Sequence, residues 1–192
     1  GASSYGVDVD ISGDGSTVAI GGGLDPNVDD LKTGSVKTFR LVNDAWSSIG
    51  QTIYGEADFD EAFYVALNRA GDVLAHGAHK NDSAGDDAGQ LKVYDLVDNS
   101  WTQRGATLKG AEGDRFGGDL NLDDTGNILA VSALLEDLSD VYTFSGSVSL
   151  FMWNGSSWEI LSKFTGTGDR AFMFSNRLSS DGGVLAVSAR YE

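Results

Sequence analysis

The sequence predicts an all-β protein built as a tandem array of small antiparallel sheets. Two observations lead to this fold class. Hydrophobic residues alternate with a period of two, and the chain repeats itself about every 55 residues. The turn glycines of the repeat, Gly15, Gly71, Gly126 and Gly182, are spaced by 56, 55 and 56 residues. No segment shows a sustained helical period, so we expect almost no α-helix.

Three further landmarks keep the same period. They are glycines that open an apolar run (Gly34, Gly89, Gly146), tryptophans (Trp46, Trp101, Trp158) and glycines that close the unit (Gly55, Gly110, Gly166). Four independent markers with one period identify a true internal repeat, because chance does not align four residue types at one spacing.

Within the first unit the alternating pattern predicts four strands. The first covers residues 7–11, and a tight turn at Gly15 leads into a second strand over residues 17–21. A polar loop over residues 24–33 precedes a third strand, residues 35–41, and a turn at 43–44 leads to a fourth, residues 46–53. Four antiparallel strands in about 55 residues are the size of a β-propeller blade.

Neighbouring blades are expected to stack, because one four-stranded sheet cannot bury both of its faces alone. Small residues such as Ala19 and Gly21 recur in the second strand and suit a crowded inner position. The repeated tryptophans are predicted to pack between blades. Trp153 lies outside the repeat, beside the turn at 154–155, and has two interpretations. Rim packing is favoured over a ligand contact.

The period divides the 192-residue chain into one repeat array. Blade 1 covers residues 5–60, blade 2 residues 61–115 and blade 3 residues 116–171, and residues 172–192 supply the first two strands of blade 4. Three full blades plus half a blade are expected to belong to a larger ring.

Composition excludes several functional classes. The formal net charge of −16 opposes binding to nucleic acid, whose phosphates need basic partners. The apolar runs are too short for a membrane-spanning helix, so no membrane insertion is expected. The absence of cysteine excludes disulfides, thiolate catalysis and cysteine-bound metal.

Short motifs add a family resemblance. An aromatic-glycine element stands at Tyr5-Gly6 and Phe116-Gly117 and is altered at Phe172-Met173 and at Glu61-Ala62, which Phe63 follows. A degenerate Gly-Ala-Pro element stands at residues 21–23, 77–79, 132–134 and 188–190, without its proline. Together they resemble the FG-GAP repeats of integrin-α-like β-propellers, in the degenerate form of bacterial and algal relatives. The resemblance covers nearly the whole chain and implies a secreted or cell-surface propeller that acts in adhesion or ligand recognition.

FG-GAP repeats often carry a calcium loop between the first two strands, of the form D-x-[DN]-x-D-G-x-x-D, in which carboxylates supply hard oxygen ligands. Copy one comes closest, with Asp10, Ser12 and Asp14, but Val18 stands where the last carboxylate should be. We therefore expect no cofactor and an ordinary tight hairpin, with calcium at these three residues as the alternative.

A second group of acids recurs in the loop between the second and third strands. Its members are Asp25, Asp29 and Asp30 in copy one, Asp82, Asp86 and Asp87 in copy two, and Glu136, Asp137 and Asp140 in copy three. Equivalent loops of stacked repeats line up on one side of an array. These acids could contact a cation, a ligand or a basic partner. A solvated acidic loop is the favoured interpretation.

Few residues suggest catalysis. His76 and His79 are the two imidazoles of the chain, and no serine lies in the strand–turn–helix elbow of a hydrolase. Asp8 and Asp10 could form a carboxylate pair for glycoside chemistry, but the other copies do not repeat it. The sequence therefore predicts that the chain is not an enzyme.

The predicted function is that of an extracellular or cell-surface propeller segment. It would act as a protein-interaction, adhesion or structural scaffold module, with other protein chains or further blades as partners. A glycan-binding, lectin-like propeller is the alternative, and a glycoside hydrolase domain is the third hypothesis.

Overall fold

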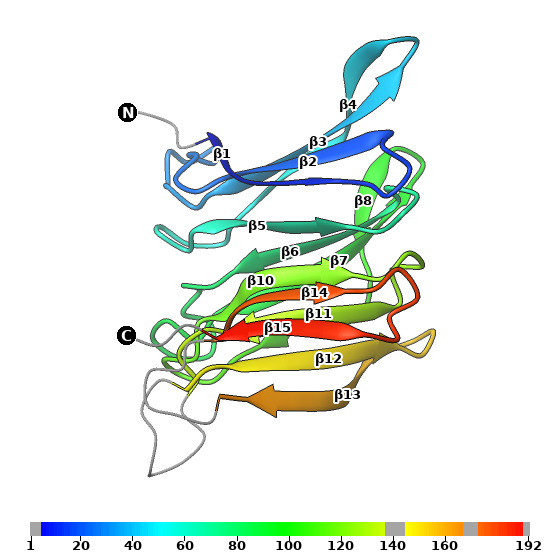
Figure 1. Cartoon of the computed structure of the whole chain (residues 1–192). Helices are drawn as coiled ribbons and strands as arrows, with labels where there is room; N and C mark the ends of the chain where they lie inside the picture. The colour runs from blue at the N-terminus through cyan, green and yellow to red at the C-terminus, as the bar shows by residue number, and fades with distance from the viewer. Residues whose placement is uncertain (1–4, 137–144, 167–172, 190–192) are drawn as a thin grey trace.

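The structure is a computed structural model that describes residues 5–136, 145–166 and 173–189. These residues form fifteen β-strands and no α-helix, which confirms the predicted all-β fold. The strands make separate antiparallel sheets that follow one another as propeller blades, three of them complete and one with two strands (Figure 1). The described residues contain no helix long and apolar enough to cross a membrane.

Blade 1 consists of four strands in sequence order: β1 (Tyr5–Ile11), β2 (Thr17–Gly22), β3 (Ser35–Val42) and β4 (Ala45–Tyr54). Each begins and ends within two residues of the strand that the alternation predicts.

Blade 2 contains β5 (Ala62–Leu67), β6 (Val73–Ala78), β7 (Gln90–Val97), β8 (Ser100–Gln103) and β9 (Leu108–Lys109). Both β8 and β9 pair with β7, so the fourth strand of this blade is interrupted. The interruption covers residues 104–107. Gly105 has a φ of 75°, and Arg104 donates hydrogen bonds to Asp95 and to the carbonyl oxygen of Gly126. The backbone N–H of Arg104 still donates to the carbonyl oxygen of Val93 in β7, so the interruption is a local irregularity of the strand.

Blade 3 contains β10 (Phe116–Leu122), β11 (Ile128–Ala133), β12 (Ser147–Trp153) and β13 (Trp158–Thr165). The fourth sheet contains β14 (Met173–Leu178) and β15 (Leu185–Ala189). The first strands of successive blades, β1, β5, β10 and β14, lie next to one another on the inner side of the array. The tight hairpin turns lie at one edge of the blades and the longer loops at the other (Figure 1).

Each blade packs closely on the next because small residues stand at the contact. A Cβ atom added to Gly21 of β2 would lie 1.9 Å from the carbonyl oxygen of Phe63 in β5. At the matching position of blade 2, a Cβ on Gly77 would lie 2.2 Å from the carbonyl oxygen of Gly117. A side chain at either glycine would therefore force the blades apart.

Two of the three repeated tryptophans join neighbouring blades, as predicted. The indole of Trp101 is buried against blade 1, where its N–H donates a hydrogen bond to Thr38. The indole of Trp158 in blade 3 donates to the carbonyl oxygen of Arg104 in blade 2 at 3.2 Å. Trp46 of blade 1 is half exposed.

Candidate functional site

Carboxylates of the innermost strand connect blade 1 to blade 2. Asp8 and Asp10 of β1 accept hydrogen bonds from the backbone N–H groups of Val65 and Leu67 in β5, at 2.9 and 2.6 Å. Each carboxylate also accepts the N–H of its own following residue. These acids therefore act as bridges between strands that have no backbone ladder between them.

The same bridges connect blade 3 to blade 4. Asp119 of β10 accepts the N–H of Asn176 at 2.6 Å, and the amide oxygen of Asn121 accepts the N–H of Leu178 at 2.7 Å. The sequence reasoning treated Asp8 and Asp10 as a carboxylate pair and missed this role. The signal was present, since Asp119 and Asn121 follow Asp8 and Asp10 by 111 residues each. It was hidden because blade 2 has other residues at these positions.

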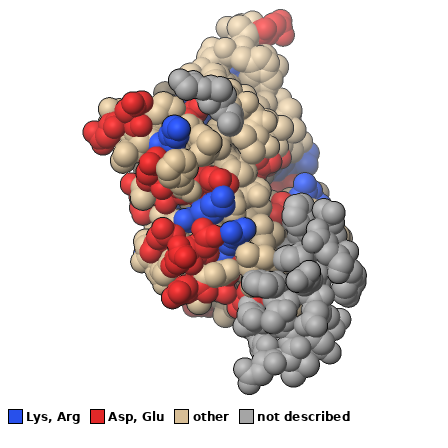
Figure 2. Space-filling model, turned by 90° about the vertical axis from the view of Figure 1, so that its left-hand side faces the viewer, with Lys and Arg blue, Asp and Glu red and all other residues tan. Residues whose placement is uncertain are grey.

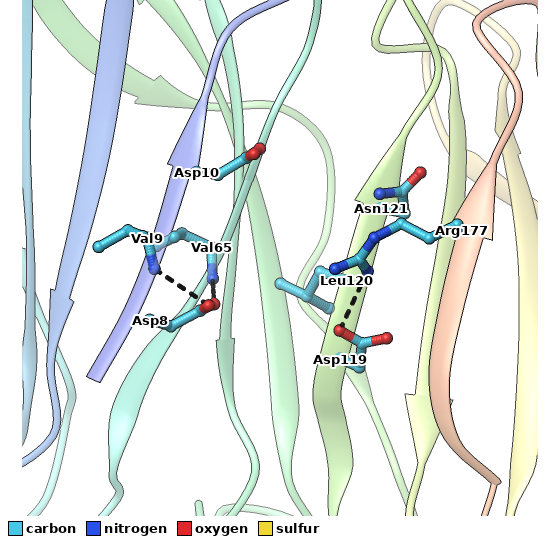
Figure 3. A pocket seen from close by; sticks show the side chains of 8 residues that line it. All are labelled: Asp8, Val9, Asp10, Val65, Asp119, Leu120, Asn121 and Arg177. Carbon is cyan, nitrogen blue, oxygen red and sulfur yellow. Dashed lines mark hydrogen bonds and ion pairs between the residues drawn. The ribbon is translucent and has the colours of Figure 1, made fainter. Parts of the chain in front are cut away.

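A small polar cavity of about 70 Å³ lies between the two sets of bridges. Its lining includes Asp8, Asp10, Asp119, Asn121 and Arg177, whose side chains come from β1, β10 and β14 (Figure 3). Burial raises the pKa of Asp8, Asp10 and Asp119 above the usual range. The guanidinium of Arg177 lies 3.6 Å from Asp119. The lining acids already accept hydrogen bonds, so the arrangement holds blades together as built.

The three residues of the predicted calcium loop do not converge. Asp10 turns toward blade 2, whereas Asp14 accepts hydrogen bonds from the Ser12 hydroxyl and the Ser16 N–H at 2.7 and 2.8 Å. These two bonds lower the pKa of Asp14 to about 2. Within residues 5–136, 145–166 and 173–189, no three histidine or acidic side chains are grouped so that they could hold a metal ion. Calcium binding stays an untested hypothesis.

Two of the predicted loop acids, Asp25 and Glu136, are buried and serve the fold, in contrast to the solvated acidic loop that the sequence favoured. Asp25 accepts hydrogen bonds from the hydroxyl of Ser35 and the ammonium of Lys37. Glu136 is bonded in the same way by Ser147 and Lys163. Each acid thus attaches its loop to the strand that follows. The shared sequence signal is a serine at the start of the following strand, Ser35 in β3 and Ser147 in β12. The lysine comes from β3 in blade 1 and from β13 in blade 3.

The remaining loop acids line the long-loop edge, where acidic side chains gather with a few basic ones among them (Figure 2). Asp29, Asp30, Asp82 and Asp86 are exposed there, while Asp87 forms an ion pair with Arg115 at 2.6 Å. Asp137 and Asp140 lie outside the described residues.

Trp153 is half-buried in a packed group at the junction of blades 2 and 3. Its ring centroid lies 5.5 Å from that of Trp158, and the Arg104 guanidinium lies 5.7 Å from the same ring. A Cβ added to Gly105 would lie 2.7 Å from the indole. The structure therefore gives Trp153 the packing environment that rim packing requires.

Both histidines are buried and lack full hydrogen bonding within the described structure. Nε2 of His76 and Nδ1 of His79 have no partner there. Burial lowers the pKa of each imidazole to about 4, so both are neutral near pH 7. The nearest carboxylate of His79 is Glu61, at 3.7 Å from Nε2.

An apolar groove lies on blade 1, and the sequence analysis did not predict it. The cavity has a volume of about 410 Å³ and is lined by Val18, Ile20, Phe39 and Trp46. Val9 and Ile11 of β1 are also exposed, at 61% and 55%. We call these six residues the blade 1 face.

The counterparts of this face in blade 2 are buried. Val65, Leu67, Leu74, Tyr94 and Trp101 stand where blade 1 has Val9, Ile11, Val18, Phe39 and Trp46. They form one hydrophobic cluster with residues of blade 1, namely Ala19, Val36, Ile49 and Ile53. The indole shows the contrast most clearly, with 4% of Trp101 exposed against 49% of Trp46. The blade 1 face is therefore a blade-packing surface with no blade on it among the described residues.

Comparison with known proteins supports the fold. No model of a protein family matches the chain, and no curated protein matches it, so the resemblance to FG-GAP repeats stays a prediction. Among solved structures, hydrazine synthase from Kuenenia stuttgartiensis has 12% identity and a TM-score of 0.60 over 93% of this chain and 48% of that one. A Bacteroides fragilis protein provisionally assigned as a 6-phosphogluconolactonase has 14% identity and a TM-score of 0.58 over 94% and 46%. TolB from Acinetobacter baumannii has 14% identity and a TM-score of 0.51 over 94% and 37%.

These neighbours correct one prediction. The expectation that the chain is not an enzyme is contradicted, because the neighbours with the same fold include proteins named as enzymes, hydrazine synthase and the assigned 6-phosphogluconolactonase. The blade fold therefore gives no reason to exclude catalysis. The chain spans less than half the length of each of these three structures. At these identities the likeness shows one thing, that the chain folds as an array of β-propeller blades.

Proposed function

We propose that the chain acts as a protein-interaction and structural scaffold, in which the blade 1 face binds a further β-propeller blade. The observation that carries this proposal is the contrast between Trp46 and Trp101. The two residues hold the same place in the repeat, and the second is buried because blade 1 covers it. A blade that covers the blade 1 face would bury Trp46 in the same way.

The chemistry of the partner follows from the internal contact. Blade 1 covers blade 2 with Ala19, Val36, Ile49 and Ile53, which are small or aliphatic and nearly fully buried. A partner sheet therefore needs a small residue in its second strand and aliphatic residues in its outer strands. Burial of large apolar side chains is worth about 1.5–3 kcal/mol each, so covering several of the blade 1 residues would stabilise the contact substantially.

The resemblance to FG-GAP repeats supports an adhesive scaffold outside the cell or at the cell surface. The partners would be other protein chains or further blades. Fractionation of cells that make the protein tests the location, which is expected in the medium or the surface fraction. Recovery in the cytosolic fraction alone would contradict it.

Adding a blade to the chain tests the docking proposal. A second copy of residues 5–60 is joined directly before Tyr5, which keeps the 56-residue spacing between the copies. The midpoint of thermal unfolding should rise by about 5 °C or more, because the added sheet covers several large apolar side chains.

The matched control is Phe39→Arg in the original blade, made with and without the added copy. A charge in the groove should abolish most of the increase that the copy produces. An added copy that produces no increase, or an increase that Phe39→Arg leaves intact, would contradict the proposal.

A further inference from the structure

Two segments of the chain have the pattern Asn-X-Ser, which marks acceptors of asparagine-linked sugar, namely residues 81–83 and 154–156. A sugar chain is bulky and hydrophilic, so a folded protein can carry it only at a surface position. The pattern alone does not distinguish the two asparagines. The structure does, because Asn154 is exposed and Asn81 is buried.

Asn154 lies in the hairpin loop that joins β12 to β13 (Figure 1). Strand pairing ends at Trp153 and Trp158, and the four residues between them, 154–157, are all exposed. The loop belongs to the edge of the array that carries the tight turns, away from the long acidic loops (Figure 1). Asn154 is therefore at the tip of a hairpin that projects from the blade.

The side chain of Asn154 is held by its own loop. Its amide oxygen accepts hydrogen bonds from the N–H groups of Ser156 and Ser157, both at 2.9 Å, and from the hydroxyl of Ser156 at 3.0 Å. Its amide nitrogen donates to the hydroxyl of Ser157 and to the carboxylate of Glu159. All of these partners are exposed residues of the same hairpin. A sugar on the amide nitrogen would therefore disturb surface contacts alone.

The tip of a blade stays exposed when blades lie on both of its sides. Val97 holds the place of Asn154 in blade 2, since each stands eight residues after the glycine that opens the run, Gly89 or Gly146. Blade 2 packs against blade 1 and blade 3, yet Val97 is 50% exposed and residues 97–100 are all exposed. A complete fourth blade beside blade 3 would therefore leave Asn154 accessible.

Asn81 has the opposite environment. It is 2% exposed, and its amide nitrogen donates a hydrogen bond to the carboxylate of Asp60 at 3.0 Å. Asp60 is equally buried and also accepts the N–H groups of Glu56 and Ala57. A sugar on Asn81 would break the bond to Asp60 and would need space that the packed loop does not provide. The folded chain therefore cannot carry a sugar at this position.

We propose that Asn154 carries an asparagine-linked oligosaccharide and that Asn81 does not. The amide nitrogen Nδ2 of Asn154 forms a bond to the anomeric carbon of the first sugar, while the bond from that carbon to a lipid-linked pyrophosphate donor breaks. The lipid pyrophosphate leaves with the electron pair, and one amide proton goes to a base of the transferase. The inference rests on the proposed location outside the cell or at its surface, because this modification belongs to secreted proteins.

The modified loop takes no part in the docking of a further blade. The residues of the blade 1 face all lie in β1 to β4, whereas Asn154 lies between β12 and β13. The oligosaccharide and the added blade are therefore tested separately.

Peptide mapping of the natural protein tests the proposal. The protein is recovered from the medium or the surface fraction of the cells that make it, and is treated with peptide N-glycosidase in water enriched in heavy oxygen. The enzyme converts a sugar-bearing asparagine into an aspartate that carries the heavy isotope, which mass spectrometry locates. We expect the label at position 154 and none at position 81. A sample without enzyme controls for spontaneous deamidation of the Asn154-Gly155 pair.

Three variants of the hairpin separate the modification from the local structure. Asn154→Gln and Ser156→Ala should each abolish the change in electrophoretic mobility that the enzyme produces, because each destroys the acceptor pattern. Ser157→Ala is the matched control. Ser157 also bonds to the Asn154 side chain but stands outside the pattern, so this variant should keep the full change in mobility.

A secreted protein with no label at Asn154 would overturn this inference and leave the proposed location standing. A label at Asn81, or a change in mobility that survives Asn154→Gln, would also overturn it. Recovery of the protein in the cytosolic fraction alone would overturn the proposed location and this inference with it.

Discussion

The indole N–H of Trp101 in blade 2 donates a hydrogen bond to the hydroxyl of Thr38 in blade 1, with 2.8 Å between Nε1 and Oγ1. Thr38 in turn donates to the carbonyl oxygen of Ile49 at 2.7 Å. Both Trp101 and Thr38 are buried. This short chain of bonds fixes the orientation of the indole that joins the two blades, and Trp46 has no such partner among the described residues.

Removing the two indoles should therefore have very different effects. Trp101→Ala should lower the free energy of unfolding by about 3–5 kcal/mol, since it empties a buried site and leaves Thr38 without its donor. Trp46→Ala should lower it by less than about 1 kcal/mol, because half of this side chain is already exposed. Urea unfolding of both variants measures the difference. Equal effects would show that Trp101 does not join the blades.

The carboxylate bridges predict a second contrast. Asp10→Ala should cost about 1–3 kcal/mol, because the N–H of Leu67 loses its acceptor in a partly buried place. Asp10→Asn should keep the stability or raise it, since Asn121 already makes the equivalent bond with an amide oxygen. Urea unfolding at pH 7 compares the two variants.

The same substitution changes the pH dependence. Burial raises the pKa of Asp10, so the folded protein holds this proton more tightly than the unfolded chain does. The contribution of Asp10 to the free energy of unfolding therefore falls as the pH rises from the ordinary aspartate pKa through the raised pKa of the folded protein. The substitution Asp10→Asn should remove this decrease. An Asp10→Asn protein that is less stable than the Asp10→Ala protein at pH 7 would contradict the bridging role.

His76 predicts a pH dependence of opposite sign. Burial lowers its pKa from 6.5 to about 4, so between these values the unfolded chain binds the proton and the folded protein does not. The free energy of unfolding therefore keeps its full value above about pH 6.5. It decreases as the pH falls toward 4, by at most about 1.4 kcal/mol per pH unit.

The substitution His76→Val tests this assignment, because Val131 and Val187 stand at the same place in blades 3 and 4. The variant should lose less stability than the original chain between pH 7 and pH 5, as followed by urea unfolding at each pH. His79→Phe is the comparison, since His79 has the same depressed pKa and remains in the His76 variant. An unchanged pH profile in both variants would exclude the buried imidazoles as its cause.

Calcium provides a test of the hairpin between β1 and β2. Asp10 bonds to blade 2 while Ser12 and Asp14 bond to each other, so the three do not form a ligand set. Excess calcium or a chelator should each shift the thermal unfolding midpoint by less than about 1 °C, because a ligand stabilises a protein only by binding its folded state. A calcium-dependent shift that Asp14→Ala removes would establish the site that the family resemblance suggests.

Much of the fold could be predicted because it depends on local sequence. The alternation of residues and the turn at Gly15, whose φ is 73°, determine the first hairpin without reference to the rest of the chain. The interruption between β8 and β9 could not be predicted, because it depends on contacts of Arg104 with Asp95 and with the neighbouring blade.

The roles of the site residues were harder to predict because they depend on what lies opposite each side chain. Asp25 and Asp29 stand in the same acidic loop, yet one is buried on Ser35 and the other is exposed. Trp46 and Trp101 have the same repeat position and differ in whether a blade covers them. A sequence repeat shows that two residues are equivalent, and the neighbouring sheet determines what each one does.

Oxidative footprinting of the individual tryptophans tests the central claim most directly, because solvent-exposed indoles react and buried ones are protected. The chain is exposed to hydroxyl radicals, and mass spectrometry measures oxidation at Trp46 and Trp101. We expect rapid oxidation of Trp46 and at least fivefold slower oxidation of Trp101, since their exposed fractions are 49% and 4%. Equal rates at the two indoles would contradict an array in which each blade covers the next and the blade 1 face stands open.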